Sequence, residues 1–265
     1  MSQPAESADL KNCCAAVYES DFAHMLLGDS FHPGGLTLTS RLGEMLGLEA
    51  GMNVLDVASG KGKSAIHLAK RFGCSVVGVD FGAENVREAS ERAEAAGAEN
   101  LTRFQQGDAE GLPFPDGTFD AILCECAFCT FPNKETAALE FTRVLKSGGA
   151  VGISDLTRTG ALPQELEGLL AWIACIADAR PVGEYVAYLS AAGLISEDVE
   201  ERDEALSEMV RQIQGKLLGA ELMAKLNKID LAGVDLDEAK RLARAASDAV
   251  RSGQLGYALI VARKF

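Results

Sequence analysis

The chain has 265 residues, 48% of them hydrophobic, and a formal net charge of −14 at pH 7. This length and composition are typical of one large α/β domain with insertions, or of two small globular domains. The negative charge argues against nucleic acid or an anionic membrane as the main partner, because phosphate binding depends on clustered lysine and arginine side chains.

The first residues, MSQPAESADLKN, are polar and acidic, and they lack the basic stretch and apolar core of a signal peptide. The sequence contains no run of about 18 apolar residues, so we expect no membrane span. Seven cysteines are an odd number, which favours free thiols over a disulfide framework. We therefore expect a cytoplasmic protein, in which residues 1–50 form an N-terminal helical cap interrupted by a turn at HPGG.

From Asn53 onwards, short apolar strands alternate with amphipathic helices. The expected strands are residues 53–59, 75–80, 101–109, 119–126 and 150–156, and the expected helices are residues 63–73, 83–97 and 134–149. This alternation predicts a doubly wound α/β fold with a mostly parallel sheet, in a core of residues 51–158. Residues 159–265 predict a helical insertion with a candidate strand near Val199, followed by a closing edge strand, LGYALIVARKF.

The segment VLDVASGKGKSAIHLA combines a strand, a glycine turn and a helix, an arrangement that several nucleotide cofactors use. A phosphate-binding P-loop requires a glycine five residues before Gly62, and Val57 occupies that position. The turn also satisfies the dinucleotide pattern G-x-G-x-x-A, but this short pattern alone is weak, and the carboxylate of Asp56 would repel a pyrophosphate. The same carboxylate would attract the ammonium and sulfonium groups of S-adenosylmethionine.

Two further acids extend this interpretation. Asp80 ends the second expected strand, where its carboxylate can accept hydrogen bonds from two ribose hydroxyls. Asp108 lies at the end of the third expected strand, where its side chain and the backbone amide of Ala109 could face an adenine ring. The acids after three successive strands therefore favour S-adenosylmethionine over the other two cofactors.

Four segments, VLDVASGKG, GVDFG, GDAEGLPFPDGTFDAI and RVLKSGGAVGISD, resemble the successive motifs of class I S-adenosylmethionine-dependent methyltransferases that act on small molecules. The match runs in order through residues 53–156. The resemblance implies a Rossmann-like fold and methyl transfer, with no resident metal. The residues that it assigns to the cofactor are Asp56, Ala58, Ser59, Gly60, Gly62, Asp80, Phe81, Gly107, Asp108 and Ala109. A non-catalytic binding module of this fold and an NAD-dependent oxidoreductase are the alternatives.

Three cysteines, Cys124, Cys126 and Cys129, lie within six positions in the segment LCECAFCTF. A zinc site here would lack the usual paired C-x₂-C arrangement and a fourth ligand. The C-x-x-C pair formed by the last two falls at the wrong point of the fold for a thioredoxin-like redox site. Because side chains alternate along a strand, the first two should share one face of the sheet. We expect structural roles for Cys74, His24, His32 and His67.

The region that follows resembles arsenite methyltransferases. In that family one cysteine lies eight residues before the lysine that begins the next helix, and Cys126 stands eight residues before Lys134. A second family cysteine lies in the helical insertion, where this chain has Cys175. The resemblance implies that these thiolates bind trivalent arsenic, whose lone pair attacks the methyl group without a general base.

Trivalent arsenic readily takes three sulfur ligands, so the resemblance also implies a third thiol, for which Cys13 and Cys14 are the upstream candidates. A thiol reductant would then take part in the reaction. Unlike the cysteine-bearing tail of the family, residues 204–252 contain no cysteine. The alternative substrate is a small organic acceptor, methylated at carbon or sulfur in an apolar pocket.

Overall fold

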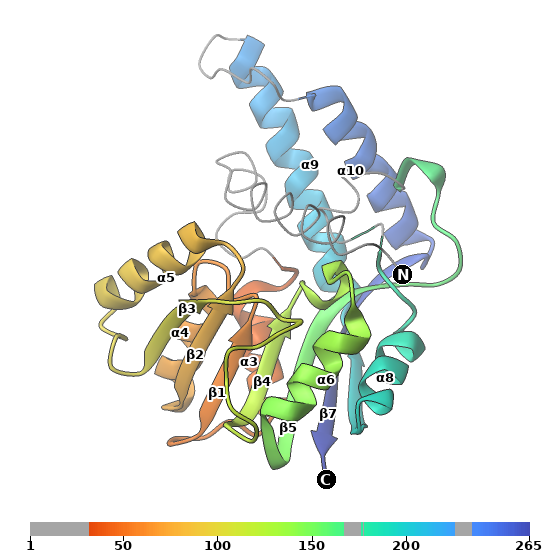
Figure 1. The fold of residues 1–265 in the computed structure, drawn as a ribbon. Coiled ribbons are helices and arrows are strands. Elements are labelled where there is room, and N and C mark those ends of the chain that lie inside the picture. The colour runs from red at the N-terminus through yellow and green to blue at the C-terminus, as the bar shows by residue number, and fades with distance from the viewer. Residues whose placement is uncertain (1–31, 167–175, 177, 226–234) are drawn as a thin grey trace.

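The computed structural model describes residues 32–166, 176, 178–225 and 235–265. Within these residues seven strands form one sheet in the order β3-β2-β1-β4-β5-β7-β6 (Figure 1). The strands are β1 (Asn53–Val57), β2 (Ser75–Asp80), β3 (Thr102–Gln106), β4 (Phe119–Glu125), β5 (Leu145–Arg158), β6 (Leu194–Glu201) and β7 (Leu255–Lys264). The strands from β3 to β5 pair in parallel, and β7 pairs antiparallel with both of its neighbours. The predicted doubly wound, mostly parallel fold is confirmed.

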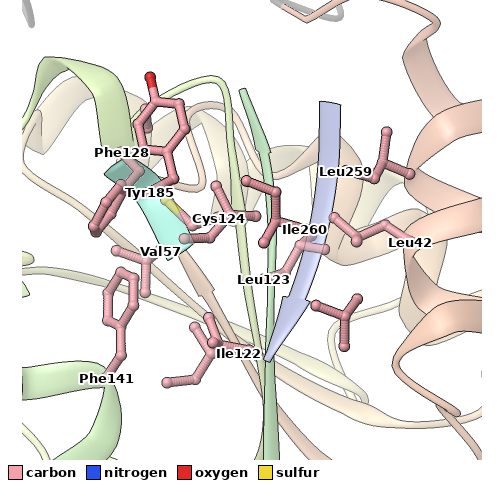
Figure 2. Close-up of a cluster of buried hydrophobic side chains, with 14 of the residues drawn as sticks. Leu42, Val57, Ile122, Leu123, Cys124, Phe128, Phe141, Tyr185, Leu259 and Ile260 are labelled. Atoms are coloured by element: carbon pink, nitrogen blue, oxygen red, sulfur yellow. The ribbon is translucent and has the colours of Figure 1, made fainter. Parts of the chain in front are cut away.

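Helices cover both faces of this sheet (Figure 1). The helices of the described residues are α3 (Gly35–Met45), α4 (Lys63–Phe72), α5 (Ala83–Ala95), α6 (Lys134–Val144), α8 (Val182–Ala191), α9 (Asp203–Lys225) and α10 (Leu236–Arg251), with the 3-10 turns η1 (Phe128–Thr130) and η2 (Gln164–Leu166). Helix α3 packs on α4, and α6 packs on α8. The fully buried side chains of Leu42 in α3 and Phe141 in α6 approach the strands from opposite sides (Figure 2). Each apolar face of the sheet is thereby removed from water.

The order of the strands reverses beside β1, which lies between β2 and β4. Val57, the last residue of β1, pairs with Cys124 near the end of β4, so the carboxyl ends of these two strands lie side by side. In open α/β sheets, ligands bind in the crevice at the carboxyl ends of the strands beside such a reversal. We call this part of the molecule the switch-point edge, and it is where a ligand site is expected.

The C-terminal strand β7 differs from the closing edge strand that the sequence suggests. It lies between β5 and β6 and pairs with β5 at nine successive positions. Residues 255–262 are buried, as an inner strand requires. The edge is instead β6, which includes Val199, where the sequence predicted a strand. A register shift between Ser196 and Asp198, together with the acidic side chains of β6, discourages pairing with a further strand.

Helix α6 ends earlier than the sequence indicated. Its last residue is Val144, and β5 begins at Leu145, which pairs with Phe119 of β4. The two glycines that we expected to stop the helix, Gly148 and Gly149, therefore lie at the irregular start of a strand, where Gly148 has a left-handed φ of 78°. The pairing of β4 with β5 decides this boundary, and local helix propensity does not include the energy of that pairing.

Helices α9 and α10 form an antiparallel pair that projects beyond the sheet (Figure 1). Asp235 caps α10, because its side chain accepts a hydrogen bond from the amide of Glu238 at 2.8 Å. These helices and α8 lie in residues 159–265, where the sequence predicted a helical insertion with a strand near Val199. In the described residues, no helix has the length and apolar character needed to cross a membrane.

Two of the three clustered cysteines belong to the core. Cys124 and Cys129 are fully buried, and Cys124 faces the side of the sheet on which Phe128, Phe141 and Tyr185 gather (Figure 2). The ring of Phe128 lies 5.9 Å from that of Phe141 and 6.0 Å from that of Tyr185. A thiol in such surroundings behaves as a small apolar side chain.

Candidate active site

The glycine turn between β1 and α4 contains three left-handed residues, Ala58, Gly60 and Gly62, with φ angles of 57°, 51° and 75°. A Cβ on Gly62 would come within 2.6 Å of the ring of Phe104 in β3, so this position requires glycine for packing as well as for φ. A Cβ on Gly60 would meet nothing within 4 Å. The turn is therefore held against the sheet at Gly62 and is open to a ligand at Gly60.

Three carboxylates from three adjacent strands bind this turn and the first residues of α4. Asp80 at the end of β2 accepts a hydrogen bond from the amide of Gly60 at 2.8 Å. Asp56 in β1 accepts one from the amide of Ala65. Glu125 at the end of β4 accepts a hydrogen bond from the hydroxyl of Ser64 at 2.6 Å. Their exposed fractions are 7% for Asp80, 2% for Asp56 and 5% for the side chain of Glu125.

Asp56 is the least satisfied of these acids. Its Oδ2 atom is buried without a hydrogen-bond partner in the part of the chain that the structure describes. Burial raises the pKa of Asp56 well above its usual value, and the charges of Glu125 and Asp80 raise that pKa further. The buried hydroxyl of Ser59, in the same turn, has no described partner either. Because such atoms are costly to leave unsatisfied, the site fits a ligand that brings a cation or a strong donor.

Asp80 is positioned by its own neighbours. Its Oδ1 atom accepts hydrogen bonds from the amide of Gly82 at 2.9 Å and from the side chain of Asn85 at 3.0 Å. Burial raises the pKa of Asp80, and the hydrogen bonds from Asn85, Gly82 and Gly60 oppose that effect. Since a carboxylate offers about four acceptor positions, at least one is left for a ribose hydroxyl.

The other residues assigned to the cofactor lie along the same edge. Gly107 follows β3 and its amide donates to the carbonyl of Asp80 at 2.9 Å. Asp108 accepts a hydrogen bond from the amide of Glu110 at 2.9 Å, and Ala109 lies between them, half-buried. The carbonyl of Phe81 accepts a hydrogen bond from the side chain of Gln106 at 3.0 Å. The structure thus brings the predicted cofactor residues together at the carboxyl ends of β1, β2 and β3.

Glu125 is a site residue that sequence reasoning missed. Both of its carboxylate oxygens lie 3.1 Å from the hydroxyl of Thr39, which can donate to either, and Nε2 of His32 lies 3.5 Å from Oε2. Nδ1 of His32 lies 3.3 Å from the carbonyl of Pro33. Glu125 therefore connects α3 and His32, which precedes that helix, to Ser64 at the start of α4. Its one signal in the sequence is an acid that directly follows the apolar run from Ala121 to Cys124 at the end of a strand.

Cys126 follows directly and is partly exposed, unlike its two cysteine neighbours. Its φ of 52° is left-handed, and its amide donates to the carbonyl of Ser154 at 2.7 Å. Burial raises the pKa of Tyr257 well above its usual value, and charge at Cys126 and then Glu125 adds to that effect.

The expectation that Cys124 and Cys126 share one face of the sheet needs correction. Strand β4 ends at Glu125, so the alternation of side chains does not extend to Cys126. The other thiols proposed as substrate ligands, Cys13, Cys14 and Cys175, lie outside the described residues, as does His24.

The remaining residues that the sequence singled out occupy structural positions. His67 shares a hydrogen bond with the hydroxyl of Ser40 at 2.7 Å, and burial lowers the pKa of His67. Cys74 is buried, its thiol lies 3.6 Å from the carbonyl of Leu68, and burial raises its pKa. A search of the described residues finds no group of three or more His, Cys, Asp or Glu side chains that could hold a metal ion.

The switch-point edge, the open glycine turn and the buried carboxylates together fit the cofactor site of a class I S-adenosylmethionine-dependent methyltransferase. The methyltransferase domain family matches residues 48–214, which is more than half of the chain, and the chain belongs to this family. The protein is an S-adenosylmethionine-dependent methyltransferase. The unpartnered oxygen of Asp56 fits the ammonium group of that cofactor.

Two characterised relatives illustrate the family. The chain is 31% identical to methyltransferase GfsG of Streptomyces halstedii, over 63% of this chain and 61% of GfsG. It is 27% identical to 27-O-demethylrifamycin SV methyltransferase of Amycolatopsis mediterranei, over 92% of this chain and 93% of that enzyme. The chain therefore spans less than two thirds of GfsG and nearly all of the second relative.

A solved structure supports the fold. Phosphoethanolamine N-methyltransferase 2 of Haemonchus contortus, in complex with phosphomonomethylethanolamine and S-adenosylhomocysteine, superposes with a TM-score of 0.80. The two chains are 19% identical, and the match covers 96% of this chain and 60% of that one. None of these three similar proteins is named as an arsenite methyltransferase, so they do not support the finer resemblance.

Proposed function

We propose that this enzyme methylates a soft, thiol-binding acceptor, arsenite or a related metalloid, which Cys126 binds. The observation that supports the proposal is the backbone of Cys126, a partly exposed thiol with a φ of 52° at the carboxyl end of β4. A left-handed conformation costs a non-glycine residue roughly 1–2 kcal/mol. Strain of this kind persists where surrounding structure maintains it, and it is concentrated at functional sites.

The polar groups around Cys126 support an acceptor that has no proton to remove. Glu125 already accepts hydrogen bonds from Thr39 and Ser64. The ring of His32 lies between the carbonyl of Pro33 and Glu125. A general base must reach the proton that it removes, and both of these groups are engaged within the protein. Trivalent arsenic carries a lone pair and no proton, so orientation is the main contribution required of this chain.

In this proposal S-adenosylmethionine supplies the methyl group from its sulfonium. The thiolate of Cys126 would hold the acceptor beside the switch-point edge, and Asp56 and Asp80 would hold the cofactor. Cys175, with Cys13 or Cys14, would complete the arsenic ligands, and these three remain predictions from sequence. A thiol reductant would keep the ligands reduced.

The test is to incubate the purified protein with S-adenosylmethionine, a thiol reductant and arsenite, and to separate the arsenic species by chromatography and mass spectrometry. Methylated arsenic is expected from the parent protein. Cys126→Ser and Cys175→Ser should each reduce the rate by about 100-fold or more, because the ligands act as a unit. Cys74→Ser, which alters a buried thiol near the start of β2, is the matched control and should retain activity. Full arsenite methylation by Cys126→Ser would refute the proposal.

A small organic acceptor, methylated at carbon or sulfur, is the second candidate. The match to 27-O-demethylrifamycin SV methyltransferase over 92% of this chain supports an organic acceptor, although the name of that relative points to methylation at oxygen. This second candidate predicts no arsenic product and methyl transfer that survives loss of both Cys126 and Cys175. Screening metabolite extracts with labelled S-adenosylmethionine would then find the acceptor.

A further inference from the structure

We propose that Glu125 is a specificity-determining residue, which makes the site prefer the positively charged S-adenosylmethionine over its product S-adenosylhomocysteine. The two differ in charge because, on methyl transfer, the carbon–sulfur bond breaks and its electron pair stays on sulfur. The sulfonium cation thereby becomes a neutral thioether, and the methyl group bonds to the lone pair of the acceptor. This proposal uses the methyl donor of the family and is independent of the acceptor's identity.

The geometry places three carboxylates around one turn. Their strands are neighbours in the sheet in the order β2-β1-β4, about 4.8 Å apart from one strand to the next. Each acid binds a different point of the segment from Gly60 to Ala65. Glu125 is the member that lies next to Cys126, on the side where β4 ends. A ligand bound in the open turn would therefore lie near three carboxyl groups.

Compensation of these charges is incomplete in the described residues. Lys61 is the buried lysine of the turn, and its ammonium lies 2.9 Å from Glu88 rather than beside the three acids. The imidazole of His32 contacts Glu125, and the charge of Glu125 also acts on His67. Asp56 has the amide of Ala65 on one oxygen and no described partner on the other. This unpartnered oxygen is a separate observation that favours binding of a cation at these acids.

The charge of Glu125 should therefore act on the two ligands unequally. Both carry the ammonium of the methionine portion, which Asp56 can satisfy, whereas the sulfonium is present only before the reaction. In surroundings of intermediate dielectric constant, a nearby carboxylate attracts a cation substantially more than it attracts a neutral sulfur. Exchange of product for fresh cofactor would then be favoured by the site itself.

The experiment is calorimetric titration of the full chain with S-adenosylmethionine and with S-adenosylhomocysteine, for the parent and for Glu125→Gln. Glutamine keeps an acceptor oxygen for Ser64 and Thr39 and removes the charge. We expect the Kd for S-adenosylmethionine to rise by about tenfold, equal to about 1.4 kcal/mol, and the Kd for S-adenosylhomocysteine to change by less than about twofold. Equal weakening of both ligands, or no change in either, would overturn the proposal.

Two control variants separate charge from packing. Thr39→Val removes a hydroxyl that donates to Glu125 and keeps the carboxylate, so the ratio of the two Kd values should stay at the parent value. Glu200→Gln removes a charge that pairs with Arg41 and Arg202 on the edge strand, and it should also leave the ratio unchanged. If the Kd for S-adenosylhomocysteine divided by the Kd for S-adenosylmethionine falls in either control as much as it falls in Glu125→Gln, the assignment is contradicted.

A second readout is the pH dependence of binding, which follows Asp56. This carboxyl faces Glu125 and Asp80, and it receives the amide of Ala65. Since a bound cation stabilises its charged form, binding of S-adenosylmethionine should release protons and strengthen as the pH rises. In Glu125→Gln one source of the raised pKa is absent, so this dependence should move to lower pH. An unmoved profile in a folded variant would indicate that Glu125 acts only through packing.

Discussion

Replacing Asp56 by asparagine should stabilise the protein without ligand and weaken its response to S-adenosylmethionine. The carboxylate is 2% exposed, its Oδ2 atom has no described partner, and burial and the charges of Glu125 and Asp80 raise its pKa. A raised pKa means that the folded state holds its proton to higher pH than the unfolded state does. Stability is therefore lost as the pH rises from the ordinary range of an aspartate through the raised value, and Asp56→Asn avoids that loss.

The magnitude follows from the cost of an unsatisfied buried group. At about pH 8 the variant should be more stable than the parent by about 1–3 kcal/mol, and the difference should be smaller at about pH 5, because Asp56 takes up its proton as the pH falls. At a ligand concentration of 100 times the parent's Kd, binding contributes about 2.7 kcal/mol to the parent. A chain of this size gains roughly 2–4 °C per kcal/mol, so S-adenosylmethionine should raise the Tm of the parent by about 5–10 °C.

Urea denaturation at both pH values and thermal denaturation with and without S-adenosylmethionine measure these effects. If the variant binds about 100-fold more weakly, the same ligand concentration contributes only about 0.4 kcal/mol, or about 1 °C. A variant less stable than the parent at about pH 8 would refute the argument that Asp56 is held at a cost. A full ligand-induced rise in Tm would refute its role in binding the cofactor.

Three further predictions test the local geometry. Gly62→Ala should destabilise the fold by about 2–5 kcal/mol, because φ strain adds to overlap with the ring of Phe104 at 2.6 Å. Gly60→Ala should cost only about 1–2 kcal/mol, because a Cβ there meets nothing within 4 Å. Urea unfolding should give this order, and the reverse order would contradict the prediction. Cys126→Gly should be more stable than Cys126→Ala by about 1 kcal/mol in thermal denaturation, and equal stabilities would mean that the φ of 52° is unstrained. Tyr185→Phe should lose about 1–3 kcal/mol of unfolding free energy, because the carbonyl of Leu156 loses a buried donor at 2.9 Å; a loss below 0.5 kcal/mol would contradict this.

Strand β7 illustrates a feature that could not be predicted from the sequence. Its apolar residues predict a strand, and they cannot tell an edge position from an inner one, because both are compatible with the same composition. The position is decided by antiparallel pairing with β5 on one side and β6 on the other. The early end of α6 at Val144 has a similar cause, since β5 begins pairing at Leu145. Both are contacts between segments far apart in the chain.

The sequence by itself determined the fold class, because strand and helix periods alternate. It also determined the glycine turn at which we propose that the cofactor binds, because the left-handed conformations of Gly60 and Gly62 depend on local residues. Only the tertiary structure decided that Glu125 joins Asp56 and Asp80 at that turn, and that Cys126 leaves the strand with a left-handed φ while Cys124 is buried. The physical reason is that these side chains become neighbours when β1 pairs with β4 in the sheet. Local spacing encodes the conformation of each turn, and the pairing of distant strands determines which charges meet there.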